Sequence, residues 1–252
     1  MPSGQSNSLF GIGRFTNIRF MKANIANKIF NSLILPILTY GSEVWGVYSN
    51  WNFDKWDKSP IEKVHLRFCK YFLGVNSKAS NVASRSELGR LPLLISIFSR
   101  TLKYITHVTN LPENSIAKQA FYISKELHSQ NKKCYYSNTI NFLKTFCNAP
   151  ESLTLEYHIR KQNIPCYKKK IESEYKEIWR NKLQNSKKLN FYKTLKDNYD
   201  REKYLDLLKQ FRLRSILSKF RISNHNYYLK RLDIMRIILK TILTLTFAKC
   251  VI

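Results

Sequence analysis

Apolar residues recur three and four positions apart along most of the chain, which is the pattern of amphipathic helices. The clearest example runs from Ile61 to Leu73. Its apolar positions fall on one helical face and are Ile61, Val64, His65, Phe68, Cys69, Phe72 and Leu73. The opposite face carries Glu62, Lys63, Arg67 and Lys70. Gly74 follows, where a helix end favours a left-handed residue. We interpret His65 as a packed histidine of the core and not as a ligand.

The same spacing predicts further helices in both halves of the chain, over residues 81–88, 94–108, 115–128, 138–146, 167–183 and 204–221. Alternating runs of β-branched residues, which are typical of strands, are few. Only 7 Gly and 7 Pro interrupt the 252 residues. The sequence therefore predicts a mainly α fold, a bundle of amphipathic helices with little or no sheet, in one domain or two helical subdomains.

A strongly apolar series leads into the segment that ends at Trp45. Its predicted core positions are Ile25, Ile29, Phe30, Leu33, Ile34 and Ile37. Pro36 lacks a backbone donor and disfavours helical angles at Leu35, so we expect a kink or a break there. Glu43 is the only acid of the run. We interpret it as a capping or hydrogen-bonded structural acid and not as a catalyst.

Two polar connectors, Gln130–Lys133 and Asn148–Pro150, divide the chain. We expect five consecutive regions along the sequence. They are a flexible N-terminus over residues 1–17, a helical domain over 18–128, a linker with a short helix over 129–155, a basic helical domain over 156–231 and an apolar tail over 232–252.

The tail from Leu232 to Ile252 is apolar, but Arg236, Lys240 and Lys249 interrupt it. Its longest uncharged run, Thr241–Ala248, has eight residues. A membrane-spanning helix needs about 20 apolar residues, so we expect no span. An interfacial helix or anchor, and self-association through the tail, are the alternatives.

The chain carries 43 Lys and Arg against 17 Asp and Glu, a formal net charge of +26. The halves divided at residue 126 carry +9 and +17, so the second half is the more basic. Such a surplus favours a polyanionic partner, because Lys and Arg displace counterions from phosphates. The alternative is a compositional bias, since the chain is also rich in Asn, Ile and Tyr.

The helix predicted over residues 204–221 carries a basic stripe opposite its apolar residues, with Asp206 its only acid. We expect its basic residues to contact nucleic-acid phosphates, and they are Lys209, Arg212, Arg214, Lys219 and Arg221. Phosphate contacts give affinity without reading the base sequence. An ordinary solvated helix face is the alternative interpretation.

The five cysteines are widely spaced and odd in number: Cys69, Cys134, Cys147, Cys166 and Cys250. This pattern argues against a disulfide framework and against a zinc cluster. An intracellular, reducing compartment (nucleus or cytoplasm) fits best, and the polar first eight residues lack the features of a secretory signal. Asp54 and Asp57 are close enough in sequence to share Mg²⁺, but Lys55 and Lys58 beside them disfavour it. We expect no metal and no cofactor.

No sequence motif for catalysis stands out. The chain contains no Gly-rich phosphate loop, no G-x-S-x-G and no H-E-x-x-H. Polymerase chemistry requires carboxylates that converge on two Mg²⁺ ions, and the acids here are sparse. We therefore expect no enzymatic activity.

Several short sequence blocks carry a family resemblance through their order and spacing, over roughly residues 14–226. The blocks are Leu35-Pro36-Ile37-Leu38-Thr39-Tyr40-Gly41-Ser42-Glu43-Val44-Trp45, Ile61-Glu62-Lys63-Val64, Phe68-Cys69-Lys70, Leu73-Gly74-Val75, Asn81-Val82-Ala83, Glu87-Leu88-Gly89-Arg90-Leu91-Pro92 and Phe220-Arg221-Ile222-Ser223-Asn224-His225. The chain resembles the C-terminal part of the polymerase polyprotein of non-LTR retrotransposons (LINE-type, jockey- or CR1-like). The resemblance implies a helical thumb, over residues 18–128, and the region downstream of it.

In that family the catalytic Asp-Asp motif and the endonuclease lie upstream of these blocks, and a Cys/His cluster follows the last one. None of these has a counterpart here, so the resemblance assigns no catalytic or metal residue. It implies a non-catalytic reverse-transcriptase-derived fragment that binds RNA or RNA–DNA backbone weakly and without sequence preference, with no small-molecule substrate. The alternative is a degenerate or domesticated remnant that serves as a helical protein-interaction scaffold or has no function.

Overall fold

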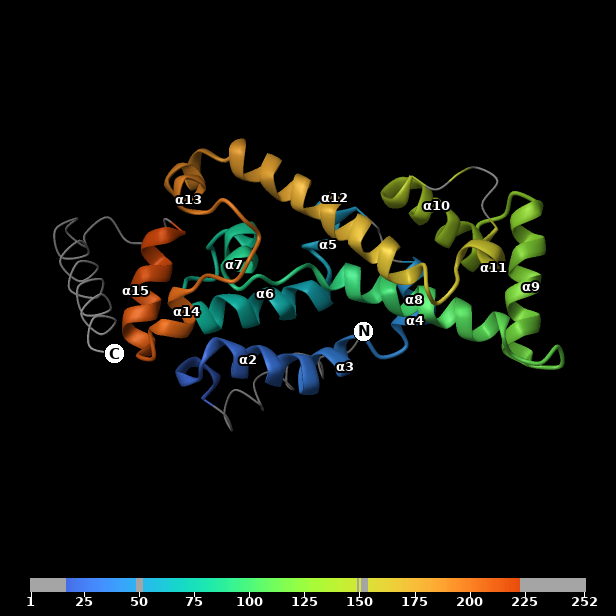
Figure 1. Cartoon of the computed structure of the whole chain (residues 1–252), viewed down its shortest axis with the longest axis horizontal. Coiled ribbons are helices and arrows are strands. Elements are labelled where there is room, and N and C mark those ends of the chain that lie inside the picture. The colour runs from blue at the N-terminus through green and yellow to red at the C-terminus, as the bar shows by residue number, and fades with distance from the viewer. Residues whose placement is uncertain (1–16, 49–51, 149, 151–153, 223–252) are drawn as a thin grey trace. The chain divides into compact units, whose positions relative to one another are not determined.

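The computed structural model describes residues 17–48, 52–148, 150 and 154–222 (Figure 1). Every regular element in these residues is a helix, so the predicted mainly α fold without a sheet is confirmed for them. No helix among them is both long enough and apolar enough to cross a membrane. The predictions for residues 1–16 and for the apolar tail 232–252 lie outside the described residues.

The chain forms two compact units, and each is assembled from segments that are far apart in sequence. Unit 1 contains residues 1–30, 66–90 and 182–252, and unit 2 contains residues 31–65 and 91–181. The sequence-based division used consecutive regions instead. Local patterns of apolar and polar residues carry no information on pairing between distant segments, so they do not reveal such an arrangement.

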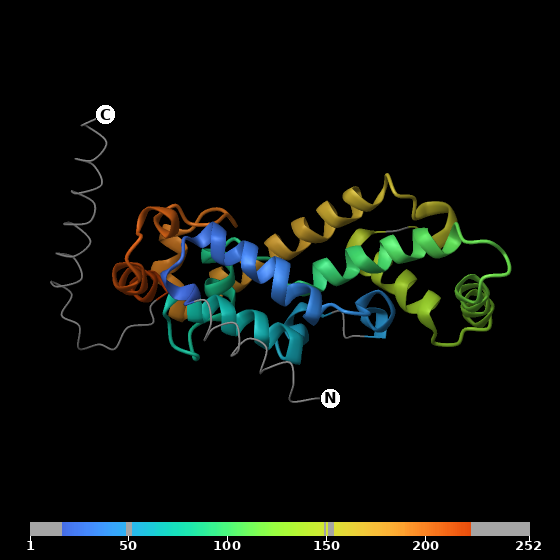
Figure 2. The same ribbon diagram turned by 90° about the horizontal axis from the view of Figure 1, so that it is seen from below.

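Unit 2 is built around one long apolar helix. Its elements are the π-helical turn η2 (Phe30–Ile34, of which Phe30 belongs to unit 1), α3 (Leu35–Leu38), α4 (Ser42–Trp45), η3 (Gly46–Tyr48), α5 (Phe53–Trp56), the first turns of α6 (Pro60–Leu73), α8 (Leu93–Thr109), α9 (Ile116–Ser129), α10 (Tyr135–Cys147), α11 (Leu155–His158) and most of α12 (Ile164–Gln184). Helix α8 supplies the core residues Leu94, Ile97 and Leu102, all completely buried. Phe98 of α8 packs on Phe142 of α10, with ring centroids 4.1 Å apart. Helix α9 lies across the end of α8 (Figure 2).

Unit 1 contains the shorter helices and all of the residues discussed below as a candidate site. Its elements are η1 (Ile18–Phe20), α2 (Ala23–Ile29), the later turns of α6, α7 (Asn81–Glu87), η4 (Lys187–Leu189), α13 (Asn190–Leu195), α14 (Tyr204–Leu207) and α15 (Phe211–Arg221). Phe68 and Phe72 of α6 are buried, and Phe68 contacts Phe30 with ring centroids 4.5 Å apart. Gly74 ends α6 in the left-handed conformation, at φ +67°, as its position predicted.

The sequence pattern placed Glu62 on the face opposite the apolar residues, but Glu62 lies in the core of unit 2. Its Oε2 atom accepts hydrogen bonds from the Trp56 indole at 2.8 Å and from the backbone N–H of Leu93 at 2.9 Å. Leu93 is the first residue of α8, where a carboxylate is favourable because the N–H groups of a helix start lack partners. The Nδ1 atom of His65 lies 2.9 Å from Oε1 of Glu62. The predicted packing of His65 in the core is confirmed.

The segment before Trp45 is less deeply packed than its pattern predicts. Ile25, Leu33 and Ile37 were expected in the core, but they are between 43% and 50% exposed. The predicted disturbance at Pro36 is present in another form: the π-helical turn η2 precedes the proline, and α3 ends at Leu38. A π-turn widens the helix, which accommodates a residue that cannot donate its hydrogen bond.

Glu43 has a structural contact within unit 2. Its carboxylate lies 3.7 Å from Nε of Arg100, and its backbone carbonyl accepts a hydrogen bond from the Tyr135 hydroxyl at 3.0 Å. The ion pair agrees with a structural role for the carboxylate, but its Oε2 atom has no hydrogen-bond partner among the described residues, so the expected hydrogen bond is not seen at that atom.

Candidate nucleic-acid interface

The helix predicted over residues 204–221 is interrupted. Helix α14 ends at Leu207, and the backbone of Leu208 is extended (φ −84°, ψ 96°) before α15 begins at Phe211. Leu208 is buried, and so is Leu205 one turn earlier. The break therefore separates Lys209 from the other four predicted phosphate-binding residues, which lie on α15.

Arg214 is an internal side chain of unit 1 and is only 1% exposed. Its guanidinium donates hydrogen bonds to the backbone carbonyl of Met21, at 3.2 Å, and to that of Arg19. It also lies over the ring of Phe72, 4.2 Å from the centroid. Burial lowers the pKa of Arg214 from its usual value. Arg214 joins α15 to the N-terminal segment of the unit and leaves no guanidinium at the surface.

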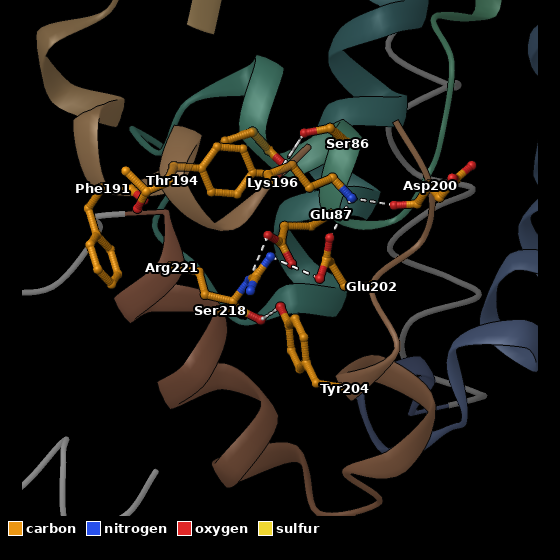
Figure 3. Close-up of polar contacts among 12 residues, drawn as sticks. Ser86, Glu87, Phe191, Thr194, Lys196, Asp200, Glu202, Tyr204, Ser218 and Arg221 are labelled. Carbon is orange, nitrogen blue, oxygen red and sulfur yellow. Dashed lines mark hydrogen bonds and ion pairs between the residues drawn. The ribbon is translucent and has the colours of Figure 1, made fainter. Parts of the chain in front are cut away.

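Arg221 is the second predicted phosphate ligand that has internal partners (Figure 3). Its Nε atom donates to Oε1 of Glu87 at 3.0 Å, and a second nitrogen lies 2.9 Å from Oε2 of Glu202. Burial acts to lower the pKa of Arg221, but these two carboxylates outweigh it and raise that pKa above its usual value. Glu87 is completely buried, and desolvation raises its pKa in spite of the opposing effect of Arg221.

The contacts of Arg221 belong to a larger network, which we name the Glu87 network and which consists of Glu87, Lys196, Glu202, Tyr204, Ser218 and Arg221. The Lys196 ammonium lies 2.6 Å from Oε1 of Glu202 and also donates to the carbonyl of Asp200. The Tyr204 and Ser218 hydroxyls are 2.8 Å apart, and burial raises the pKa of Tyr204 well above its usual value. Two carboxylates therefore face two cations, and the network holds α7, the loop before α14 and α15 together.

The loop of this network is also fixed through the backbone. The N–H of Glu202 donates to the carbonyl of Glu87 at 3.0 Å, and the Tyr199 hydroxyl donates to the carbonyl of Arg90 at 2.7 Å. Gly89 has φ +61°, and a Cβ atom there would lie 2.6 Å from the backbone nitrogen of Arg201. Close approach of two backbones therefore requires glycine at this position. No local pattern of residues indicates this pairing, because Glu87 and Glu202 are far apart along the chain.

The remaining predicted ligands lie at the surface of unit 1. Lys209 and Arg212 are exposed, and Lys219 is partly exposed. Arg212 and Lys219 are seven residues apart on α15 and so share a helical face. Exposed or partly exposed cations of the neighbouring η4 and α13 extend the set, and we name as the α13–α15 cations Lys187, Lys188, Lys193, Arg212 and Lys219. None of these five forms an ion pair within the described residues.

Charge is divided unequally between the two units. Among the described residues, unit 1 carries 20 Lys and Arg against 5 Asp and Glu, net +15, and unit 2 carries 17 against 10, net +7. Four of the five described acids of unit 1 lie between residues 197 and 206, and the fifth is Glu87, which contacts that loop. The rest of unit 1, as far as the structure describes it, is basic without acidic residues.

A cavity of about 600 Å³ lies between α13, the loop of residues 196–203 and α15. One wall is apolar and consists of Phe191, Leu195, Leu213, Ile216, Leu217 and Phe220. The rest of the lining comes mainly from the loop of residues 196–203, which carries both acidic and basic side chains, and includes Arg221. Phe191 is 42% exposed, and its ring meets that of Phe220 edge to face with centroids 4.9 Å apart.

Over residues 17–48, 52–148, 150 and 154–222, no three His, Cys, Asp or Glu side chains are placed to bind one ion. Of the cysteines in this part of the chain, Cys69, Cys134 and Cys147 are buried and Cys166 is exposed, and none of the four forms a disulfide.

Comparison of the chain with protein-family models, with curated proteins and with solved structures gave no match. The resemblance to the non-LTR reverse transcriptases therefore stays a prediction that rests on the sequence blocks.

Proposed function

We propose that unit 1 binds the sugar–phosphate backbone of nucleic acid, RNA or an RNA–DNA duplex, without reading the base sequence. In this proposal the chain is a non-catalytic fragment similar to the helical thumb and downstream region of a non-LTR retrotransposon polymerase. The observation that carries the proposal is the charge of unit 1: net +15 in its described residues, with the acids gathered at one loop. Lys and Arg at such a surface release counterions when they contact phosphates.

The proposed ligands are the α13–α15 cations and Lys209. Arg214 and Arg221 are left out, because their guanidinium groups bind backbone carbonyls and buried carboxylates instead. Both residues nevertheless hold α15, which carries part of the basic surface, in place. Arg221 fixes one end of α15 to α7, and Arg214 fixes its middle to the N-terminal segment, so Arg212 and Lys219 are presented on a helix with a defined position in the unit.

The test is the salt dependence of binding to a fluorescent RNA–DNA duplex. One variant replaces Lys187, Lys188, Arg212 and Lys219 by Gln. Its matched control replaces four exposed lysines of unit 2 by Gln, namely Lys103, Lys132, Lys133 and Lys169. For duplex DNA each phosphate contact contributes about 0.9 to the slope of log affinity against log salt. Loss of all four contacts should reduce the slope by roughly 3 to 4, and the control should leave it nearly unchanged. Binding that does not depend on salt, or an equal loss in both variants, would refute the proposal.

A helical protein-interaction scaffold is the second candidate, and exposed apolar residues of unit 2 favour it. Leu33, Ile37 and Val44 are each about half exposed, and Tyr40 is 84% exposed. Apolar residues so close in sequence and open to solvent are typical of protein-binding surfaces. If they mediate self-association, replacing Leu33 and Ile37 by Ser should lower the oligomeric mass measured by light scattering. An unchanged mass would reject self-association through these residues.

A further inference from the structure

On helix α15 the polar face is more deeply buried than the apolar face. Its buried residues are Arg214, Ser215 and Ser218, which contact the rest of unit 1. Its apolar residues Leu213, Ile216, Leu217 and Phe220 are only partly buried and line the cavity. The sequence pattern predicts the reverse, with the apolar face packed inside. An apolar wall beside a basic surface indicates a ligand that is apolar in one part and anionic in another.

We infer that this cavity receives a base of single-stranded nucleic acid, stacked on Phe191, while the adjoining phosphates lie along the α13–α15 cations. The inference rests on the proposed function, to which it adds the class of nucleic acid and the contact that selects it. Proteins that bind single strands commonly combine a basic groove with aromatic side chains on which bases stack.

Phe191 has the exposure and the surroundings that stacking requires. Although 42% of its surface is open, its ring is held against Phe220 at an interplanar angle of 72°. An aromatic ring held in place by a neighbour loses little further freedom when a base stacks on it. The volume of about 600 Å³ is within the usual range for small-molecule sites, which is about 300–1,000 Å³.

The charges around the cavity indicate where the phosphates of a bound strand lie. On the loop, Glu202 is paired with Lys196 and Arg221, whereas Asp197 and Asp200 are exposed. These two carboxylates would repel phosphates but can accept hydrogen bonds from the amino groups of a base edge. The α13–α15 cations do not line the cavity but lie on the same segments, η4, α13 and α15. The backbone of the strand therefore runs along these segments, away from the two loop carboxylates.

A single strand fits this site better than a duplex. In a duplex the bases are stacked on one another and paired, and extruding one costs a few kcal/mol. In a single strand the faces of the bases are accessible without that cost. Phosphate contacts alone do not detect whether the bases of a strand are accessible. A cavity that binds a base therefore adds a preference for single strands that the basic surface lacks.

The experiment measures the affinity of the full chain for three fluorescent probes of equal length over a series of salt concentrations. The probes are a single-stranded oligonucleotide, the same strand with abasic sites throughout, and its blunt duplex. The variant is Phe191→Leu, which keeps an apolar side chain but removes the ring. Its matched control is Tyr40→Leu, which removes an exposed aromatic ring from unit 2. Circular dichroism verifies that both variants are folded.

Stacking on an aromatic side chain typically changes affinity by about 5- to 150-fold for each base. The wild type should therefore bind the normal strand at least about 5-fold more tightly than the abasic strand. Phe191→Leu should abolish that ratio and leave the affinity for the abasic strand unchanged, and Tyr40→Leu should leave both unchanged.

Equal affinity of the wild type for the normal and the abasic strand would overturn the inference. So would a ratio that survives in Phe191→Leu. If the abasic strand still binds in a salt-dependent way, the proposed function stands and only the base site is wrong. If no probe binds, the proposed function fails and the inference fails with it.

Discussion

The buried pair of Glu87 and Arg221 makes a strong prediction about stability. Replacing Arg221 by Met leaves the Glu87 carboxylate in the interior without its closest cation, 3.0 Å away in the native protein. Glu87 is completely buried, and the Arg221 side chain is only 12% exposed. Removing one partner of a buried ion pair typically costs about 3–5 kcal/mol. Because whole domains are stable by only about 5–15 kcal/mol, this loss is a large fraction of the total.

The cost should depend on pH. Burial already raises the pKa of Glu87 above its ordinary value of 4.5, and Arg221 is the principal group that lowers it. An acid whose pKa is higher in the folded state contributes most stability below its unfolded pKa, and this contribution is lost as pH rises through the folded pKa. Without Arg221 the folded pKa rises further. The stability difference between Arg221→Met and the wild type should therefore widen between about pH 5 and pH 8.

The measurement is urea unfolding of the full chain followed by far-UV circular dichroism at several pH values. Amide exchange at Glu202, whose N–H donates to the carbonyl of Glu87, gives a local reading. The control is Arg201→Met, which breaks an ion pair with Asp206 whose side chains are 35% and 42% exposed. Pairs of that kind contribute only about 0–1 kcal/mol. Equal, pH-independent losses in the two variants would refute the reasoning.

Two further substitutions test individual contacts. Gly89→Ala places a Cβ atom on a left-handed backbone, 2.6 Å from the Arg201 nitrogen. It should therefore destabilise unit 1 by about 1–3 kcal/mol or more and speed amide exchange at Glu202. An unchanged exchange rate would contradict this close approach. Glu62→Ala leaves the buried donors of Trp56 and Leu93 without their acceptor, at about 1–3 kcal/mol for each group, and should lower the urea midpoint and change tryptophan fluorescence. A midpoint equal to that of the wild type would show that these donors find other partners.

The helices that depend on local pattern are the ones that sequence reasoning predicted best. Helix α6 has a one-sided apolar pattern and a terminal Gly, and its observed bounds differ from the prediction by one residue. Apart from that of His65, the burial of polar side chains was not predicted. Glu62, Glu87 and Arg214 lie in the interior because their partners come from distant parts of the chain, which helical periodicity does not reveal.

The candidate site, too, could be predicted from the sequence only where local composition decides. The basic character of residues 204–221 was evident from composition, and Lys209, Arg212 and Lys219 do lie at or near the surface. The internal roles of Arg214 and Arg221 required the fold. So did the cavity, because its apolar wall combines residues of α13 and α15 that no single amphipathic pattern connects.

The interleaving of the two units has a consequence for how the protein is made. All segments of unit 2 have been synthesised when the chain reaches Asn181, but residues 17–30 of unit 1 still lack their partners from residue 182 onward. At a translation rate of roughly 5–20 residues per second, the interval between Phe30 and Lys182 is on the order of 10–30 s. Aromatic side chains of unit 1, such as Phe20 of η1 and Phe72 of α6, therefore stay incompletely covered until their partners Phe211 and Arg214 have been synthesised. Neither unit corresponds to a continuous stretch of messenger RNA, so neither can be expressed as one uninterrupted segment of the chain.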